Sequence, residues 1–286
     1  MLKQRVITAI VLLAVLLPAL FYKTPEPFCA VALLLIAAGG WEWGRLNACS
    51  PGACLALAAV CVGLCALAWY GGLLAKPLPV LWAAAGAAWV LGGGWLLRNG
   101  VAGWPRIPKV VRLLGGLAAL LVAWLAVAQA RVAGIDFLLS VLLLVWVADI
   151  FAYFAGRALG GRFSRGKLAP SISPGKSWEG VWGGMVGVVV LSLAWVWLGR
   201  AGIGGGFWAD TTLYSRLADH HGIVVMVLAV IFLAAMSVVG DLVESLIKRS
   251  AGVKDSSGLL PGHGGVLDRV DALLPTLPLA MMLATL

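Results

Sequence analysis

Several carboxylate side chains of this chain lie in or beside strongly apolar runs, where an isolated negative charge is costly. Asp241 lies seven residues, roughly 10 Å of helix, inward of Lys248. On insertion scales an ionised carboxylate at such a depth in a membrane costs at least about 2.5 kcal/mol. Asp268 and Asp271 stand at i and i+3 where a later helical run begins, and Asp149 lies inside an earlier one. These side chains need a polar cavity, a cation or a partner, and an ion pair between Asp241 and a lysine is the purely structural alternative.

A bound cation is the chemical explanation that we favour for these carboxylates. Carboxylates gathered at one level repel each other unless a cation holds them, and hard oxygen ligands select Mg²⁺ or Ca²⁺. Mg²⁺ is typically held by one or two carboxylates together with substrate phosphates. His263 is the one histidine near this stretch and no cysteine accompanies it, which argues against zinc.

Basic side chains accompany the carboxylates. The spacing of Asp241, Glu244, Ser245, Lys248 and Arg249 places them on one face of a helix. The basic residues of the two nearby polar loops and their helix ends are Arg157, Arg162, Arg165, Lys167, Lys176, Lys248, Arg249, Lys254 and Arg269. Carboxylates for a metal and cations for phosphates together predict phosphoryl or nucleotidyl transfer. For any single loop arginine, a simple role in setting membrane topology is an equal alternative.

Glycines flank His263 on both sides, in the run Pro261-Gly262-His263-Gly264-Gly265. Glycine permits backbone conformations and close approaches that other residues do not, so this loop is suited to a bulky anion. His263 either contacts a phosphate or only shapes the loop, and the sequence favours neither.

The elements that must position these residues are membrane helices. The chain is 62% hydrophobic and 12% charged, with a mean hydropathy of +1.01, whereas soluble domains carry about 25% charged residues. Apolar runs near twenty residues long recur throughout. We predict an all-α, polytopic integral membrane protein with about nine transmembrane helices. The expected spans are 6–22, 27–40, 53–70, 80–97, 113–130, 136–155, 181–199, 222–248 and 269–286.

The distribution of basic residues predicts the orientation. With the N-terminus in the cytoplasm, sixteen Lys and Arg residues lie on the cytoplasmic side and five on the other, as expected for an inner-membrane protein. The loops 156–180 and 249–268 then face the cytoplasm and the C-terminus lies outside. We expect residues 1–135 to form a scaffold with oligomer and lipid contacts, and residues 136–286 to form the catalytic region. Gly183 and Gly184 fall in a predicted helix, where small residues let helices approach closely.

Other readings of the chemistry are less well supported. Pro174-Gly175-Lys176-Ser177 ends like a phosphate-binding P-loop, but Pro170 stands where that motif needs glycine. A transporter or channel would carry polar groups through to the far side, whereas these charges stop in the cytoplasmic half. A CDP-alcohol phosphotransferase would carry a DG-x-x-A-R type run, which is absent from the sequence.

The run 245–271, with Ser245 to Arg249, Lys254-Asp255 and Pro261 to Asp271, resembles the signature of the phosphatidate cytidylyltransferase family. Residues 148–157, the run 173–180 and Trp41-Glu42-Trp43 also resemble segments of that family. The resemblance implies that CTP and phosphatidic acid react to give CDP-diacylglycerol and pyrophosphate with Mg²⁺. It also implies a monovalent cation such as K⁺ and a homodimer, while no nucleic-acid partner is expected.

The resemblance further implies roles for individual residues. Asp241 and Asp268 would bind the divalent metal, with Asp271 and Asp149 in the same centre. The residues expected to take part in catalysis are Asp149, Lys176, Asp241, Lys248, Arg249, Asp268 and Asp271. Those expected to contact substrate are Arg157, Ser173, Lys176, Ser177, Glu179, Lys248, Arg249, Lys254, His263, Gly264, Gly265 and Arg269. CTP would enter from the cytosol and phosphatidic acid sideways from the lipid bilayer.

Overall fold

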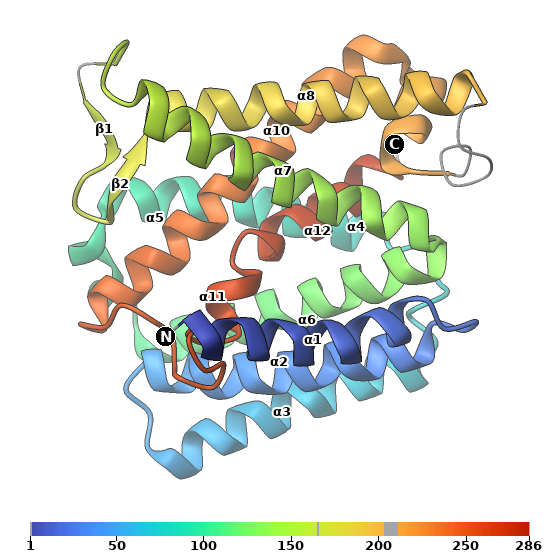
Figure 1. The fold of residues 1–286 in the computed structure, drawn as a ribbon. Coiled ribbons are helices and arrows are strands. Elements are labelled where there is room, and N and C mark those ends of the chain that lie inside the picture. Colours follow the sequence, from blue (N-terminus) through green and yellow to red (C-terminus); the bar gives the residue numbers. More distant parts are fainter. Residues whose placement is uncertain (1, 165, 203–210, 286) are drawn as a thin grey trace.

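The computed structural model describes residues 2–164, 166–202 and 211–285 (Figure 1). Within these ranges, eight helical stretches are long and apolar enough to cross a membrane, which confirms the all-α polytopic fold class. They are α1 (Leu2–Leu20), α2 (Glu26–Leu46), α3 (Pro51–Tyr70), the stretch Pro79–Asn99, α6 (Lys109–Ala133), α7 (Ile135–Leu159), α8 (Trp178–Arg200) and α10 (Leu213–Ser250).

Shorter elements connect and complete these helices. The stretch Pro79–Asn99 consists of α4 (Pro79–Ala87), a π-helical turn η1 (Ala88–Gly92) and α5 (Gly93–Asn99), and the 3₁₀ segment η2 (Val101–Arg106) follows it. A two-stranded antiparallel hairpin joins β1 (Lys167–Ala169) to β2 (Ser173–Ser177). The chain ends in α11 (Leu267–Val270) and α12 (Leu273–Leu283).

Local sequence explains where several helices begin and bend. Pro51 and Pro79 stand at first helical positions, where a missing amide proton costs nothing. The Ser50 hydroxyl caps α3 by accepting from the amide of Ala53. Gly222 interrupts the helical conformation of α10 at a φ of 86°, a left-handed value that glycine adopts without strain.

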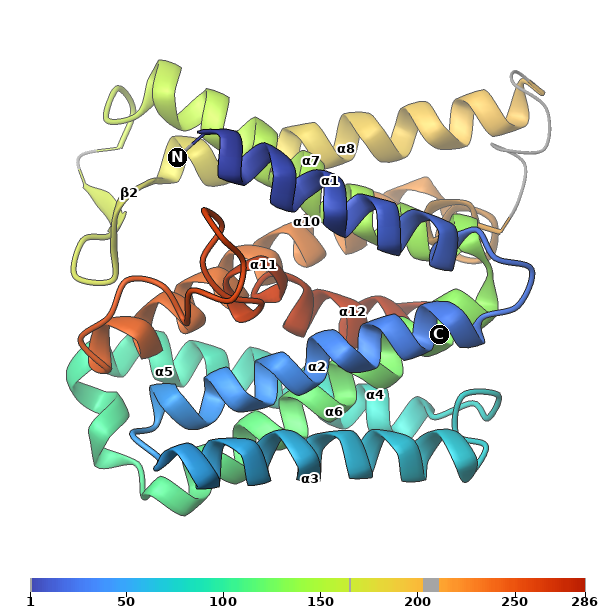
Figure 2. The ribbon, with the colours of Figure 1, turned by 60° about the horizontal axis from the view of Figure 1, so that its bottom comes forward.

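α10 is the central element of the bundle. It packs against α7 and α8 on one side and against α5 and α12 on the other, and in Figure 1 it runs obliquely between these groups. α12 in turn contacts α4 and α6, while α2 lies along α3 and α6. Figure 2 shows α1 crossing the face of the bundle between α8 and α2. The predicted scaffold and catalytic regions therefore pack directly against each other.

The C-terminal segment differs from the predicted ninth spanning helix. The expected span 269–286 is divided between α11 and α12, and α12 has 11 residues, which corresponds to about 16 Å of helix. Pro275 and Pro278 lie in that segment. The segment nevertheless ends beside His220 and Arg216, at the end of the bundle opposite the hairpin (Figure 1). The described chain thus ends at the far end of the bundle from the hairpin (Figure 1), although the C-terminal segment is not among the eight candidate spans.

Two further differences affect the site. α2 continues to Leu46, whereas the sequence predicted a helix ending at residue 40, so Glu42 belongs to a helix instead of a connecting loop. The β1–β2 hairpin was not predicted because its strands have three and five residues and because β2 contains Pro174 and Gly175, which are poor strand formers.

Close packing of α7 on α8 depends on glycine. A β-carbon at Gly183 would lie 2.2 Å from Cβ of Ala155, and one at Gly187 would lie 2.5 Å from the Phe151 ring. Neither distance leaves room for a side chain, so the expected close approach at Gly183 is confirmed.

We predict that Gly183→Leu lowers the thermal stability of the detergent-solubilised protein, because overpacking a tight contact costs about 1–3 kcal/mol. The matched control is Gly94→Leu, since Gly94 is exposed on α5 and a β-carbon there meets nothing within 4 Å. Equal unfolding temperatures for the two variants, measured by intrinsic fluorescence, would contradict this account of the α7–α8 contact.

Candidate functional site

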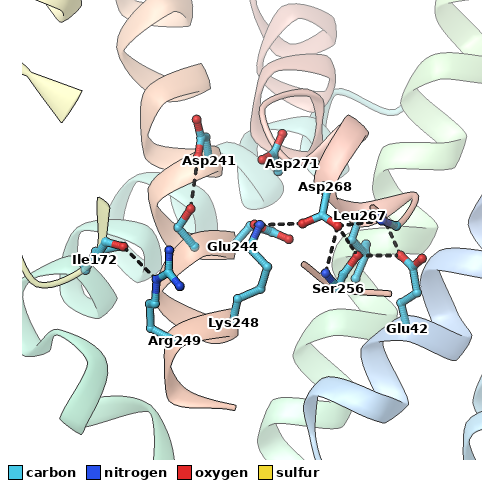
Figure 3. A network of polar contacts seen from close by, with 12 residues as sticks. Glu42, Ile172, Asp241, Glu244, Lys248, Arg249, Ser256, Leu267, Asp268 and Asp271 are labelled. Atoms are coloured by element: carbon cyan, nitrogen blue, oxygen red, sulfur yellow. Dashed lines mark hydrogen bonds and ion pairs between the residues drawn. The ribbon is translucent and has the colours of Figure 1, made fainter. Parts of the chain in front are cut away.

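Glu42 organises the loop between α10 and α11. Its side chain is 0% exposed and accepts hydrogen bonds from the amides of Val266 at 2.9 Å and Leu267 at 2.7 Å. The hydroxyl of Ser257 donates to it at 2.5 Å, and that of Ser256 lies 3.2 Å away. A buried carboxylate needs such donors to offset its desolvation. Glu42 therefore fixes the residues that lead into α11 (Figure 3).

Asp268 occupies the centre of that loop. It accepts from Lys248 at 2.5 Å, from the Gly265 amide at 2.7 Å, and from the amide and hydroxyl of Ser256 at 2.9 and 2.8 Å. Burial alone would raise the pKa of Asp268, but the Lys248 ammonium and the two amides outweigh it and hold that pKa below its usual value. Gly264 adopts a φ of 85°, and a β-carbon there would lie 2.8 Å from Oδ2 of Asp268. The glycine is required at this position for both reasons.

Lys248 joins the loop to α10. Its ammonium lies 2.5 Å from Oε2 of Glu244, one turn away, and 2.5 Å from Oδ1 of Asp268. All three side chains are largely buried, with 12% of the Lys248 side chain exposed. Removing one member would leave an uncompensated buried charge, which is strongly destabilising. Figure 3 shows the resulting chain of contacts from Glu244 through Lys248 and Asp268 to Ser256 and Glu42.

A second group of charges lies deeper along α10. Lys176 of β2 forms an ion pair with Asp241, and the Ser245 hydroxyl donates to the other oxygen of Asp241 at 3.3 Å. The carboxylates of Asp149 and Asp271 both lie within electrostatic range of Asp241 and Lys176. The ion pair with a lysine and the convergence of carboxylates, which the sequence offered as alternatives for Asp241, therefore occur together.

Asp271 is brought to Asp241 by close backbone packing. A β-carbon at Gly240 would lie 2.4 Å from the carbonyl oxygen of Asp271 and 2.8 Å from the ring of Pro275. Asp271 stands at the junction of α11 and α12, where burial and the negative charge of Asp241 raise its pKa above the usual value. Figure 3 shows the two side chains on neighbouring elements.

The loop that follows α7 is held by its own contacts. Glu179 accepts from the amides of Phe163 and Ser164 at 3.1 and 2.8 Å, and Ser177 caps α8 by accepting from the Gly180 amide at 3.2 Å. Ser173 lies in β2, paired with Ala169. These contacts give Glu179 and Ser177 a structural task in shaping the loop. The predicted basic residue Arg165 lies outside the described residues.

The remaining predicted basic residues lie around the rim. Arg249 donates to the carbonyl of Ile172 in the hairpin at 3.4 Å, and Arg157 donates to the Tyr153 hydroxyl at 3.0 Å. Exposed positions are occupied by Arg162, Lys167, Lys254 and Arg269. They add positive charge near the site without a fixed contact to its carboxylates.

The glycine loop also touches the first helix. Arg5 of α1 donates to the Gly262 carbonyl at 2.8 Å, and the Thr8 hydroxyl donates to the Pro261 carbonyl at 3.0 Å. The amide of His263 donates to the Leu260 carbonyl at 2.8 Å, whereas its Nδ1 is buried and has no hydrogen-bond partner among the described residues. The loop is therefore held from α1 and α2 at once.

The donor set fits a magnesium ion better than a transition metal. Within the described ranges, no three Asp, Glu, His or Cys side chains already form a metal-binding group; Lys176 and Lys248 instead balance Asp241 and Asp268. Mg²⁺ needs only one or two carboxylates when substrate phosphates supply further oxygens. Asp241 and Asp271 provide such a pair, and Asp149 lies in the same field.

Sequence reasoning did not assign a role to Glu42, Ser256 or Ser257. The available signal was a lone glutamate between two tryptophans near the end of an apolar run. A glutamate in that setting must find buried donors or stay in water, but the sequence does not say which donors are near. The contacts are 214 to 225 residues apart in the chain.

Comparison with known proteins gives matches along the whole chain. The model of the cytidylyltransferase family matches residues 3–286. A phosphatidate cytidylyltransferase from Haemophilus influenzae is 36% identical over 97% of this chain and 96% of its own length. One of the same name from Pseudomonas aeruginosa is 37% identical over 97% of this chain and 95% of its own length. Another from Brucella suis is 47% identical over 46% of this chain and 40% of its own.

We predict that Glu42→Gln loosens the loop that precedes α11, because the amide group of glutamine would face the backbone donors that the carboxylate now accepts. Leaving such buried groups unpaired costs about 1–3 kcal/mol. The Val266 and Leu267 amides should exchange with deuterium at least tenfold faster. Glu26→Gln, at an exposed position of the same helix, is the control, and unchanged exchange in Glu42→Gln would contradict the anchoring role.

Proposed function

This chain belongs to the cytidylyltransferase family, and we propose that it transfers the cytidylyl group of CTP to phosphatidic acid, giving CDP-diacylglycerol and pyrophosphate. The observation that carries this conclusion is the match to relatives named phosphatidate cytidylyltransferase over 97% of the chain. The buried array of carboxylates and lysines supplies the groups that such a reaction between two polyanions needs.

The chemistry makes electrostatics the main task of the protein. The nucleophile is an oxygen of a phosphate monoester, whose second pKa is about 6, so it is already largely dianionic near pH 7. A general base is therefore not required. The barrier lies in bringing two negatively charged reactants together and in stabilising the leaving pyrophosphate. Positive charges at fixed positions serve both purposes.

Lys176 and Lys248 are the two lysines best placed for this role. Each is largely buried and each touches a carboxylate of the site, Asp241 and Asp268 respectively. A buried ammonium acts on nearby phosphate oxygens through a lower effective dielectric than water provides. Lys176 lies on the hairpin and pairs with the deeper carboxylate, Asp241, whereas Lys248 is fixed between Glu244 and Asp268.

A divalent cation completes the proposal. The family resemblance pairs Asp241 with Asp268 as metal ligands, but the oxygens of Asp268 accept from Lys248, Ser256 and Gly265. Asp241 and Asp271, with Asp149 in the same field, would therefore hold Mg²⁺, and the ion would supply Lewis-acid stabilisation of the transferred phosphoryl group. The family resemblance supports a monovalent cation such as K⁺ beside it and a homodimeric enzyme. We assign to catalysis the side chains of Asp149, Lys176, Asp241, Lys248, Asp268 and Asp271, together with Arg249 at the entrance of the site.

We further propose that the enzyme lies in the inner membrane with this site facing the cytoplasm. The support is the excess of basic residues on that side of the sequence, together with the position of the hairpin and the 251–266 loop at one end of the bundle (Figure 1). CTP then reaches the site from the cytosol. Phosphatidic acid reaches it from the inner leaflet.

We predict that Asp268→Asn and Lys248→Met each lower the rate of CDP-diacylglycerol formation on the order of 10²–10³-fold, the effect of removing one preorganised electrostatic group. The assay follows pyrophosphate release from CTP in proteoliposomes containing phosphatidic acid and Mg²⁺. Asp219→Asn is the control, because Asp219 forms an exposed ion pair with Arg200. A wild-type rate in Asp268→Asn would refute the site, and ion flux without nucleotide would favour a channel.

Removal of the divalent ion should abolish activity, and added Mg²⁺ should restore it. In Asp271→Asn we expect the Mg²⁺ concentration for half-maximal rate to rise at least tenfold, because one of two carboxylate ligands is lost. The measurement is a magnesium titration of the same assay at saturating CTP. An unchanged half-saturation point with a lower maximal rate would remove Asp271 from the metal site and leave it a positioning role.

A further inference from the structure

Ile172 differs from the rest of the β1–β2 hairpin in its burial. Among residues 167–177 it is the one buried side chain, with 4% of its surface exposed, and it belongs to the apolar core of the bundle. It lies at the end of the hairpin turn, directly before β2. An isolated two-stranded hairpin is at best marginally stable in water, so this hairpin depends on its contacts with the helices.

The hairpin touches α10 at two points. The carbonyl of Ile172 accepts from Nε of Arg249 at 3.4 Å, and Lys176 forms an ion pair with Asp241. Figure 3 shows Ile172 beside Arg249, and Asp241 further along the same helix.

The spacing of these two points agrees on both elements. Asp241 and Arg249 are eight residues apart, which is about 12 Å along a helix. Ile172 and Lys176 are four residues apart, which is about 13 Å along an extended strand. β2 therefore lies along α10 in one register, with Ile172 at one end of the contact and Lys176 at the other.

The side chain of Ile172 is the stronger of the contacts at the hairpin tip. The hydrogen bond from Arg249 is longer than the usual range of about 2.7–3.2 Å, and Arg249 is itself exposed, so water competes for it. Burial of an aliphatic side chain as large as isoleucine stabilises a fold substantially. Truncation of Ile172 should therefore release the tip without removing any charged group.

Lys176 lies between two fixed points of the chain. On its C-terminal side, the Ser177 hydroxyl caps α8 by accepting from the Gly180 amide at 3.2 Å. On its N-terminal side, Pro174 and Gly175 are exposed, so the second anchor in the apolar core is Ile172. Without it, the direction of the Lys176 side chain would be set from one end only.

We propose that Ile172 is a positioning residue for the reaction, whose buried side chain docks the hairpin on α10 and so holds the ammonium of Lys176 against Asp241. The inference rests on the proposed function, which assigns Lys176 to catalysis. Ile172 has no polar side-chain group and acts only through Lys176.

The test is a double-mutant cycle that combines Ile172→Ala with Lys176→Met in the full chain. The rate of pyrophosphate release is measured in proteoliposomes that contain phosphatidic acid and Mg²⁺, at saturating CTP. We expect Lys176→Met to lower the rate on the order of 10²-fold. Ile172→Ala should lower it roughly tenfold, because misplacing a catalytic group by 1 Å can cost about 10²-fold. In the Lys176→Met background, Ile172→Ala should have no further effect, since residues that act as one unit are not additive.

Two further variants and a second measurement separate positioning from general damage. Ile172→Leu conserves the side-chain volume and should keep the rate within about twofold of wild type. Ile10→Ala is the matched control for the truncation, because Ile10 is 60% exposed on α1, and it should have the wild-type rate. In Ile172→Ala the amides of residues 167–173 should exchange with deuterium about tenfold faster, while those of residues 181–190 in α8 keep their protection.

A wild-type rate in Ile172→Ala, or an equal loss in both backgrounds of the cycle, would overturn the positioning role and leave the catalytic role of Lys176 intact. A wild-type rate in Lys176→Met would instead refute the catalytic assignment, and this proposal with it. If Ile172→Ala fails to fold, Ile172→Val takes its place in the cycle, because it removes a single methylene group. The same dependence on Lys176 is then expected with a smaller loss of rate.

Discussion

The carboxylate of Glu42 has no contact with solvent, and the rest of the site depends on the hydrogen bonds that offset the burial of its charge. Its donors come from the loop before α11, so the same hydrogen bonds that satisfy Glu42 place Asp268 opposite Lys248. Lys248 is then held between Asp268 and Glu244. Because buried charges are stable only when paired, each member of this chain fixes the position of the next. The side chains that we propose for catalysis are thus held in place by contacts within the protein.

α10 has a polar face and an apolar face because the helical repeat places its polar and apolar residues on different sides. The positions of Asp241, Ser245 and Lys248 repeat every three to four residues and face the hairpin and α11, while Gly240, Val243 and Ile247 line an apolar cavity between α5, α6 and α10. Gly240 lets the helix approach the backbone of Asp271, which no larger residue would allow. A single helix therefore carries polar side chains on one face and apolar residues on another.

Much of this arrangement could be predicted from residue spacing. The apolar runs predicted the membrane helices, and the cost of isolated charges predicted that Asp149, Asp241, Asp268 and Asp271 converge. Asp149 and Asp271 lie within electrostatic range of Asp241, whereas Asp268 pairs with Lys248. The hairpin could not be predicted, because its order comes from Lys176 meeting Asp241 and Arg249 meeting Ile172. The role of Glu42 could not be predicted either, because its hydrogen-bond partners lie at the other end of the sequence. The short α12 follows from prolines and from packing against α4 and α6, which local hydropathy does not report.

The contact of Arg5 and Thr8 with the Pro261–Gly262 turn has a consequence for biogenesis. The ribosome makes α1 well before its partner turn, which follows 253 to 257 residues later. During that interval α1 has little to pack against in the nascent chain, since only 11% of its apolar window is buried even in the finished fold. The contact of α1 with this turn can therefore form only late in synthesis, after α1 has entered the bilayer.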